Sequence, residues 1–280
     1  MFSNLQRYFN KSIAYVTLIS IGIIGLAPVA YLFLLSTKRR IDIGDVPPSL
    51  HFEWAVIVEN YREVLVNRNY ISSTINSILI TTSVVLLSLI FGTPAAYVFS
   101  RIKFKRSEQL STTILSLRFM PPVAVAVPIL LTMRFMHLNN TRPGLILPYV
   151  AASLPLVIWI LIGFFDEIPK EIDEAAEIDG ASRWRTLVQV LLPLVRPGIV
   201  VAGIFAAIFI WNEFLIGMYV IDSETLKTVP IADAGLISAQ RPIDWNVAAT
   251  VGVITLVPLL AAAFAIQKHI VQGITAGAVK

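Results

Sequence analysis

Long apolar runs, separated by short polar segments, are the dominant pattern along this chain. A helix needs about 20 consecutive apolar residues to cross the roughly 30 Å hydrocarbon core of a bilayer. Six runs reach that length, and they cover 12–36, 71–99, 111–133, 143–165, 198–221 and 245–266. The pattern therefore predicts six membrane-spanning helices.

In lipid, every backbone donor and acceptor must be paired within the protein, and runs of this length can achieve that only as helices. The strands of a closed barrel would be shorter and would alternate between apolar and polar residues. The run at 12–36 is longer than the apolar part of a typical signal peptide, so we interpret it as a retained span. The expected fold is all-α, a polytopic membrane helix bundle that forms a single transmembrane domain over 1–280.

The composition agrees with a membrane protein, because 56% of the residues are hydrophobic, 14% are charged and the mean hydropathy is +0.75. The absence of cysteine excludes disulfides and thiolate metal sites. The three histidines are scattered, and the sequence has neither an HExxH metal motif nor a GxxxxGK[ST] phosphate loop. Nor does it contain a basic stripe that would indicate nucleic-acid binding. We therefore expect no catalytic residue, no metal site and no cofactor in this chain.

The distribution of lysine and arginine indicates the orientation, since cytoplasmic loops carry the excess of these residues. Placing both termini in the cytoplasm puts the basic cluster of 101–106 in a short inner loop. The cluster Lys38-Arg39-Arg40 contradicts this orientation, but it opens a longer loop, where charge has less influence. We therefore predict a multi-pass protein with both termini in the cytoplasm.

The segment 168–197, between the fourth and fifth runs, predicts two short amphipathic helices. Pro169 suits the first turn of one helix, and Gly180 suits a left-handed turn directly after that helix ends at Asp179. Ser182 suits the N-cap of a second helix. The apolar stripe of that helix consists of Trp184, Leu187, Val188, Leu191 and Leu192, and we expect Pro193 and Pro197 to end it. These residues alone allow either a solvated connector or a lever that moves the two spans it joins.

The same segment resembles the EAA motif of ABC importer permeases. Glu174-Ala175-Ala176 is followed by Gly180 and then by Val190 and Leu192-Pro193, with valine at a position where isoleucine is usual. In that family the motif forms a coupling helix, which docks in a cleft of the ATPase subunit. The resemblance implies that Glu174 pairs with an arginine of the ATPase and that Gly180 makes the turn. It also implies that Ala175 and Ala176 pack closely, and we assign Asp179 to the same coupling surface.

Further short motifs occur in the order typical of the family and narrow the resemblance to the MalG-like branch, which handles carbohydrates. They are Asn60-Tyr61, Asn76-Ser77, Ala95-Ala96-Tyr97 with Arg101, Pro121-Pro122, 144–149, 211–214 and the tail 272–280. The resemblance implies the type I ABC importer permease fold, a location in the inner (plasma) membrane, and sugar import. A cytoplasmic tail, 268–280, is expected to reach into the ATPase dimer.

The partners that the resemblance implies are a second, related permease subunit, a pair of ATPase subunits that bind ATP and Mg²⁺, and an extracytoplasmic solute-binding protein. The membrane lipid is a further expected partner, and nucleic acid is not. This chain would then form half of the translocation pathway, and the ATPase would carry out all the ATP chemistry.

A charged group inside a span requires a cavity or a partner, which makes Glu213 a candidate for the solute path. Asn212, Trp211 and Asn76 are further candidates for this path. Hydrogen bonding between helices is the alternative role for Glu213, and a place at the membrane interface is the alternative for Trp211. Arg118 either extends toward the inner headgroups or belongs to a gate or an inter-subunit contact.

Two other classes of protein compete with an ABC permease. A secondary transporter or channel that acts alone predicts coupling carboxylates at the middle of the bilayer and inverted repeats. A polytopic membrane enzyme predicts clustered catalytic residues at one depth. Neither feature is evident, because Arg118 and Glu213 are the only charged residues within the six runs.

Overall fold

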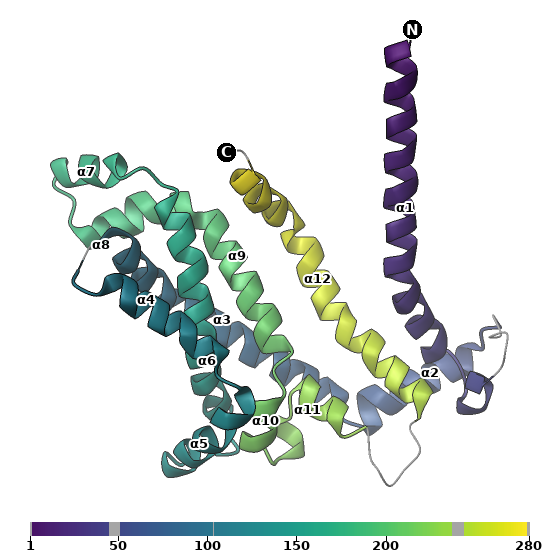
Figure 1. Ribbon diagram of the computed structural model, residues 1–280. Coiled ribbons are helices and arrows are strands. Elements are labelled where there is room, and N and C mark those ends of the chain that lie inside the picture. The colour runs from purple at the N-terminus through teal and green to yellow at the C-terminus, as the bar shows by residue number, and fades with distance from the viewer. Residues whose placement is uncertain (1, 45–50, 103, 237–243, 279–280) are drawn as a thin grey trace. The chain divides into compact units, whose positions relative to one another are not determined.

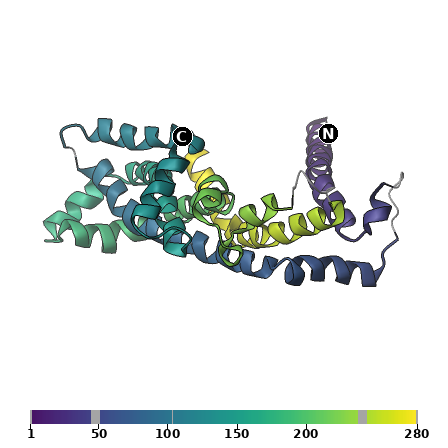
Figure 2. The ribbon, with the colours of Figure 1, turned by 90° about the horizontal axis from the view of Figure 1, so that it is seen from below.

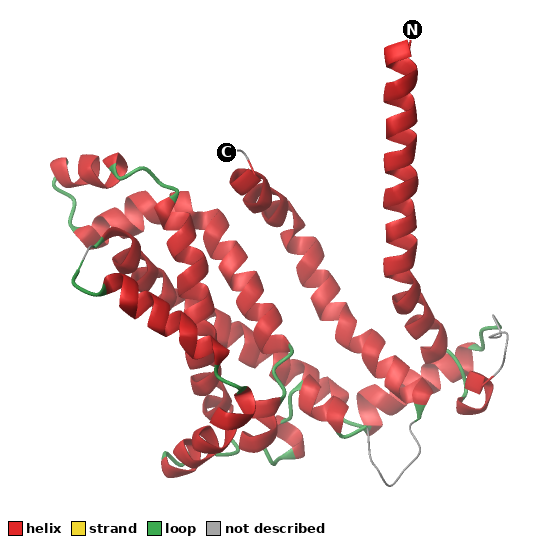
Figure 3. Cartoon of the chain, viewed as in Figure 1, coloured by secondary structure: helices red, strands yellow, loops and turns green. Residues whose placement is uncertain are grey.

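We analysed a computed structural model of the chain, which describes residues 2–44, 51–102, 104–236 and 244–278. Every regular element in these ranges is a helix (Figure 3). The longer helices are α1 (Phe2–Ser36), α2 (Trp54–Arg62), α3 (Tyr70–Arg101), α4 (Ser107–Ser116), α5 (Pro122–Phe135), α6 (Arg142–Asp166), α7 (Glu171–Ile178), α9 (Leu192–Trp211) and α12 (Trp245–Ala278). The short elements are η1 (Arg40–Gly44), η2 (Glu63–Asn67), η3 (Leu117–Phe119), α8 (Arg183–Arg185), η4 (Thr186–Leu191), α10 (Leu215–Val220), η5 (Glu224–Leu226) and α11 (Val229–Ala234).

The chain divides into two compact units, and the first combines Met1–Tyr70 with Gly235–Pro258. Its polar centre is the buried side chain of Asn60 in α2. The Asn60 amide donates hydrogen bonds to the carbonyl oxygens of Ser36 and Lys38, both at 2.9 Å, and its oxygen accepts one from Asn246 at 3.0 Å. The last carbonyl groups of a helix have no partner within the helix, so Asn60 satisfies the end of α1 and joins it to α12.

The second unit contains Ile71–Ala234 and Leu259–Lys280. In this unit α6 packs along α9, and α3 lies against both of them (Figures 1 and 2). Glycine permits the close approach of α6 and α9, because a Cβ atom on Gly198 would lie 2.4 Å from the Phe164 ring. The helices α3 and α6 are further joined by a buried hydrogen bond of 2.5 Å between the hydroxyls of Ser88 and Ser153.

Four helices are long and apolar enough to cross a membrane: Lys11–Ser36, Tyr70–Arg101, Arg142–Asp166 and the continuous helical segment Arg183–Trp211. The predicted span 111–133 is instead a pair of helices, Ser107–Phe119 and Pro122–Phe135, bent by 96°. Pro121 and Pro122 explain the break, since proline lacks the amide hydrogen and clashes with the preceding turn. If the bent pair is one span, up to five spans meet these criteria in the described ranges.

The predicted span 198–221 also differs from the observed helices. The helix ends at Trp211, and α10 begins after a short break. The predicted span 245–266 lies entirely within α12. The helix itself continues to Ala278, through most of the predicted tail 268–280; residues 279–280 lie outside the described ranges.

The prediction that Pro193 and Pro197 end the second amphipathic helix was wrong. Both residues lie within α9, which continues from η4 without a break. Pro193 directly follows η4 inside this continuous helical segment. The preceding η4 is a π-helix, a wider turn that often occurs as a local insertion in an α-helix.

Candidate coupling segment and solute cavity

The predicted helix, glycine, helix arrangement is present in the segment between α6 and α9. Gly180 has a positive φ of 81°, the left-handed conformation that glycine adopts without strain. Its amide donates to the Glu177 carbonyl at 3.0 Å, and the amide of Ala181 donates to the Ala176 carbonyl at 2.9 Å. These two bonds form a Schellman motif, which satisfies the final carbonyl groups of α7 and reverses the chain.

The second helix begins at the predicted residue. The Ser182 hydroxyl accepts a hydrogen bond from the amide of Arg185 at 3.3 Å, as an N-cap does. Leu187 and Leu191 of the predicted stripe are buried, and they anchor the helix in the apolar cluster formed with α3, α6 and α9. Trp184 belongs to the same predicted stripe, but 66% of its surface is exposed.

The exposed side of this segment combines acidic and apolar residues. Glu174, Ala175 and Asp179 are exposed, whereas Ala176 is buried against the rest of the unit. Ile178 is 86% exposed, a large value for an isoleucine, and it lies close in sequence to the exposed Trp184. The segment therefore presents an apolar surface, with a carboxylate beside it, that no other described residue of this chain covers.

The C-terminal end of α3 holds this segment in place. Arg101 forms an ion pair with Asp173 of α7 (Nε to Oδ2, 3.0 Å), and its Nη2 donates to the Ile168 carbonyl at 2.8 Å. Arg101 and the nearby Tyr97 belong to a motif that the sequence analysis quoted, but it gave no role to Asp173. Sequence alone could not identify the pair, because Arg101 and Asp173 lie on different helices and no spacing rule connects them.

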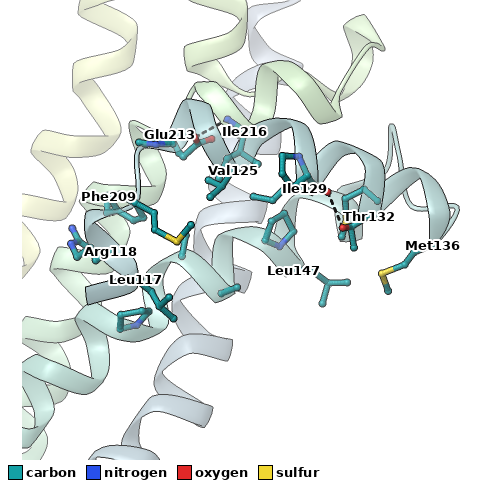
Figure 4. A pocket seen from close by; sticks show the side chains of 18 residues that line it. Leu117, Arg118, Val125, Ile129, Thr132, Met136, Leu147, Phe209, Glu213 and Ile216 are labelled. Atoms are coloured by element: carbon teal, nitrogen blue, oxygen red, sulfur yellow. Dashed lines mark hydrogen bonds between the residues drawn. The ribbon is translucent and has the colours of Figure 1, made fainter. Parts of the chain in front are cut away.

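A cavity of about 720 Å³ lies between the bent pair, α6 and the end of α9 (Figure 4). Methionine, proline, valine and isoleucine side chains form most of its lining, together with Thr132 and two charged residues, Arg118 and Glu213. The Arg118 guanidinium lies over the Phe209 ring, with 4.7 Å between the guanidinium carbon and the ring centroid. This is a cation–π contact, and it holds η3, which lies at the bend of the helix pair, against α9. The contact favours a role for Arg118 within the bundle over extension toward the headgroups.

Of the four residues predicted for the solute path, only Glu213 lines this cavity. Its carboxylate also accepts backbone hydrogen bonds from Ile216 at 2.9 Å and Gly217 at 3.2 Å, so it caps α10. The Asn212 side chain is exposed and donates to the Ile208 carbonyl at 2.8 Å, whereas Trp211 is buried. Glu213 therefore combines a structural role with a position in the cavity.

Asn76 has a different environment from the one predicted. It is almost completely buried, and its amide donates to the carbonyl oxygens of Thr225 at 2.8 Å and Lys227 at 3.2 Å. Its side-chain oxygen accepts from Arg142 at 3.1 Å. Asn76 therefore attaches the loop around η5 to α3 and α6, and it does not line the described cavity.

The described residues thus form an all-helical membrane bundle, with an exposed, glycine-terminated surface helix between two of its long apolar helices. Residues 85–276 match the family of binding-protein-dependent transport system inner membrane components, and the chain belongs to this family. It is therefore the permease subunit of an ABC importer, a multi-pass inner-membrane component that is itself a transport subunit and not an enzyme.

Curated relatives match over most of the chain. The trehalose transport system permease SugB of Mycobacterium tuberculosis is 32% identical over 91% of this chain and 92% of its own length. The trehalose/maltose permease MalG of Thermococcus litoralis is 35% identical, over 81% of this chain and 83% of its own. The sulfoquinovosyl glycerol permease SmoH of Agrobacterium fabrum is 29% identical, over 99% of this chain and 96% of its own length.

Solved structures share the fold. A chain of a bacterial ABC transporter that imports the acidic polysaccharide alginate matches with a TM-score of 0.77 at 22% identity, covering 94% of this chain and 96% of its own. A chain of an alginate transporter in complex with a periplasmic protein bound to an alginate pentasaccharide matches with a TM-score of 0.63 at 17% identity, covering 96% and 97%. At this level of identity the likeness concerns the fold alone.

Proposed function

We propose that this subunit forms half of the translocation pathway of a sugar importer and that α7 is its coupling helix. ATP and Mg²⁺ would bind to separate ATPase subunits, a second permease would complete the pathway, and an extracytoplasmic binding protein would deliver the solute. The observation that carries the proposal is the surface of α7. Glu174, Ala175 and Ile178 are exposed there, directly before a left-handed turn at Gly180 that a larger residue would strain.

The proposed solute class rests on what the relatives transport. Their names specify trehalose, trehalose and maltose, sulfoquinovosyl glycerol, diacetylchitobiose, and melibiose with raffinose and stachyose. All of these solutes are glycosides, which present many hydroxyl groups together with apolar ring faces. A cavity of about 720 Å³ lies within the usual size range of small-molecule sites, and Glu213 and Thr132 supply hydrogen-bond acceptors in it.

Six spans with both termini in the cytoplasm place α7 on the side of the ATPase. In this proposal the bent pair and α12 would supply the two spans beyond the four long helices. Three of the basic residues that this orientation places outside are paired with carboxylates within the first unit. Arg39 pairs with Glu53, Arg40 with Asp244 at 2.8 Å, and Arg68 with Glu63 at 3.1 Å.

Hydrogen bonds from Asn67, and then from Arg68, lower the pKa of Glu63 and keep its carboxylate charged, although partial desolvation opposes them.

An uptake assay tests the proposed solute class. The complete transporter, with its own second permease, ATPase and binding protein, would be expressed in cells that lack sugar importers. These cells would receive radiolabelled trehalose, maltose, melibiose and diacetylchitobiose, with glycine and spermidine as solutes of other classes. We expect ATP-dependent uptake of at least one sugar and of neither control. Uptake of glycine or spermidine without any sugar would contradict the proposed solute class.

A further inference from the structure

The inner end of α3 makes three side-chain contacts with the segment that leads into α7. The Ser100 hydroxyl donates to the Asp166 carboxylate at the end of α6. Arg101 then donates to the Ile168 carbonyl at 2.8 Å and pairs with Asp173 at 3.0 Å. Only the ion pair reaches α7 itself, so it is the direct side-chain link between α3 and the proposed coupling helix.

The ion pair lies in a largely buried environment. Only 6% of the Arg101 side chain and 17% of the Asp173 side chain are exposed, so water screens their attraction less than it screens a surface pair. Arg101 lies in the last turn of α3 and Asp173 in the first turn of α7. A cation at the C-terminus of a helix and an anion at the N-terminus are each stabilised by the helix dipole, which strengthens the link.

The link lies next to the proposed docking residue. A cavity of about 290 Å³ is lined by both members of the ion pair and by Glu174, which directly follows Asp173. Lys170, Glu177 and Arg183 line the same cavity, so the charges around the pair are balanced. Any displacement of Glu174 by a partner therefore moves the carboxylate that holds Arg101.

We propose that the Arg101–Asp173 pair transmits the movement of α7 to α3. The coupling helix is joined through the chain to α6 and α9, and the ion pair adds α3 as a third span that it moves directly. The inference rests on the proposed function of α7 as the coupling helix. Arg101 and Asp173 are positioning residues in this account, since neither is assigned a contact with the solute.

A distance measurement tests the link itself. Because the chain contains no cysteine, spin labels can be attached at Val98→Cys in α3 and Glu171→Cys in α7, two exposed positions. In the complete transporter the distance between these labels should remain the same, with a narrow distribution, without nucleotide and after trapping with Mg²⁺, ATP and vanadate. In the Arg101→Gln and Asp173→Asn variants the distribution should broaden and should shift on trapping. A shift in the unsubstituted protein, or unchanged distributions in both variants, would overturn the proposal.

Uptake separates transmission from a purely structural role. Arg101→Gln and Asp173→Asn should each reduce uptake of the panel sugars about fivefold or more, in line with typical coupling between sites, while the ATPase still co-purifies. The charge exchange Arg101→Asp with Asp173→Arg should recover part of the uptake, and Lys170→Ala, which lines the same cavity, should have no effect. Normal uptake in both single variants would refute transmission. If the ATPase binds and responds normally to Glu174 and Gly180 variants, then the proposed coupling function fails, whatever the label distances show.

Discussion

At the scale of single residues, Gly180 and Glu174 would define the proposed coupling surface. A Cβ atom on Gly180 would meet no heavy atom of this chain within 4 Å, so the need for glycine comes from its positive φ and not from internal crowding. A left-handed conformation costs other residues about 1–2 kcal/mol, and β-branched residues more. The exposed Glu174 side chain lies six residues before this constrained position, and its carboxylate is available to a partner.

Glu213 has two roles in the structure, and substitution with glutamine can separate them. In the Glu213→Gln variant the side-chain amide oxygen could still accept one of the two backbone hydrogen bonds that cap α10, so the fold should lose only about 1 kcal/mol. If the carboxylate serves the solute path, the same variant should reduce sugar uptake several-fold or change the order of preference in the sugar panel. Thermal unfolding and uptake would be measured on the same variant, with Asn212→Asp as a neighbouring control. Unchanged uptake together with a lower unfolding temperature would leave capping as the only role.

At the scale of elements, the contact between α6 and α9 depends on the absence of a side chain at Gly198. Gly198→Ala would place a Cβ atom 2.4 Å from the Phe164 ring and should destabilise the subunit by about 1–3 kcal/mol. The same substitution in a Phe164→Leu background should be less damaging, because the smaller side chain leaves room. Thermal unfolding of the four proteins in detergent forms a double-mutant cycle. An equal penalty in both backgrounds would contradict the packing argument.

The elements that sequence could predict are those governed by local rules. The runs at 12–36, 71–99 and 143–165 lie within continuous helices, since length and hydropathy alone determine them. Residue type and order likewise predicted the turn at Gly180 and the cap at Ser182. The 96° bend in the third run depends on how the chain packs after a double proline, and the hydropathy pattern contains no such information.

The candidate site was less predictable than these elements, because it depends on contacts between distant parts of the chain. The sequence marks Glu213 by its charge, but it does not show that the Arg118 guanidinium lies over the Phe209 ring. Asn76 and Trp211 were chosen from motif membership, and the structure gives Asn76 a buried role in attaching a loop. Type and spacing therefore identify which residues are unusual, whereas tertiary packing determines what they contact.

For the whole molecule, the predicted orientation makes a direct labelling test possible. Cysteine in place of Lys105 should react with an impermeant maleimide only after the inner membrane is opened, because that loop is placed in the cytoplasm. Cysteine in place of Asp233 should react in intact spheroplasts. The cysteine-free chain is itself the background control. The reverse pattern of labelling would place both termini outside and would remove α7 from the side of the ATPase.

The proposed coupling of this subunit to its ATPase depends on α7. Removing one partner of a semi-buried ion pair between subunits costs about 2–5 kcal/mol of binding free energy. We therefore expect Glu174→Ala to weaken association with the ATPase markedly. Gly180→Val should do the same by straining the turn, whereas Glu171→Ala, an exposed acidic residue in the first turn of α7, is the matched control.

The most direct measurement is co-purification of the ATPase with each variant, together with ATP hydrolysis stimulated by the loaded binding protein in reconstituted membranes. The account predicts that Glu174→Ala and Gly180→Val lose both association and stimulation, while Glu171→Ala retains them and all three variants reach the membrane in normal amounts. Full association and full stimulation in both of the first two variants would contradict it.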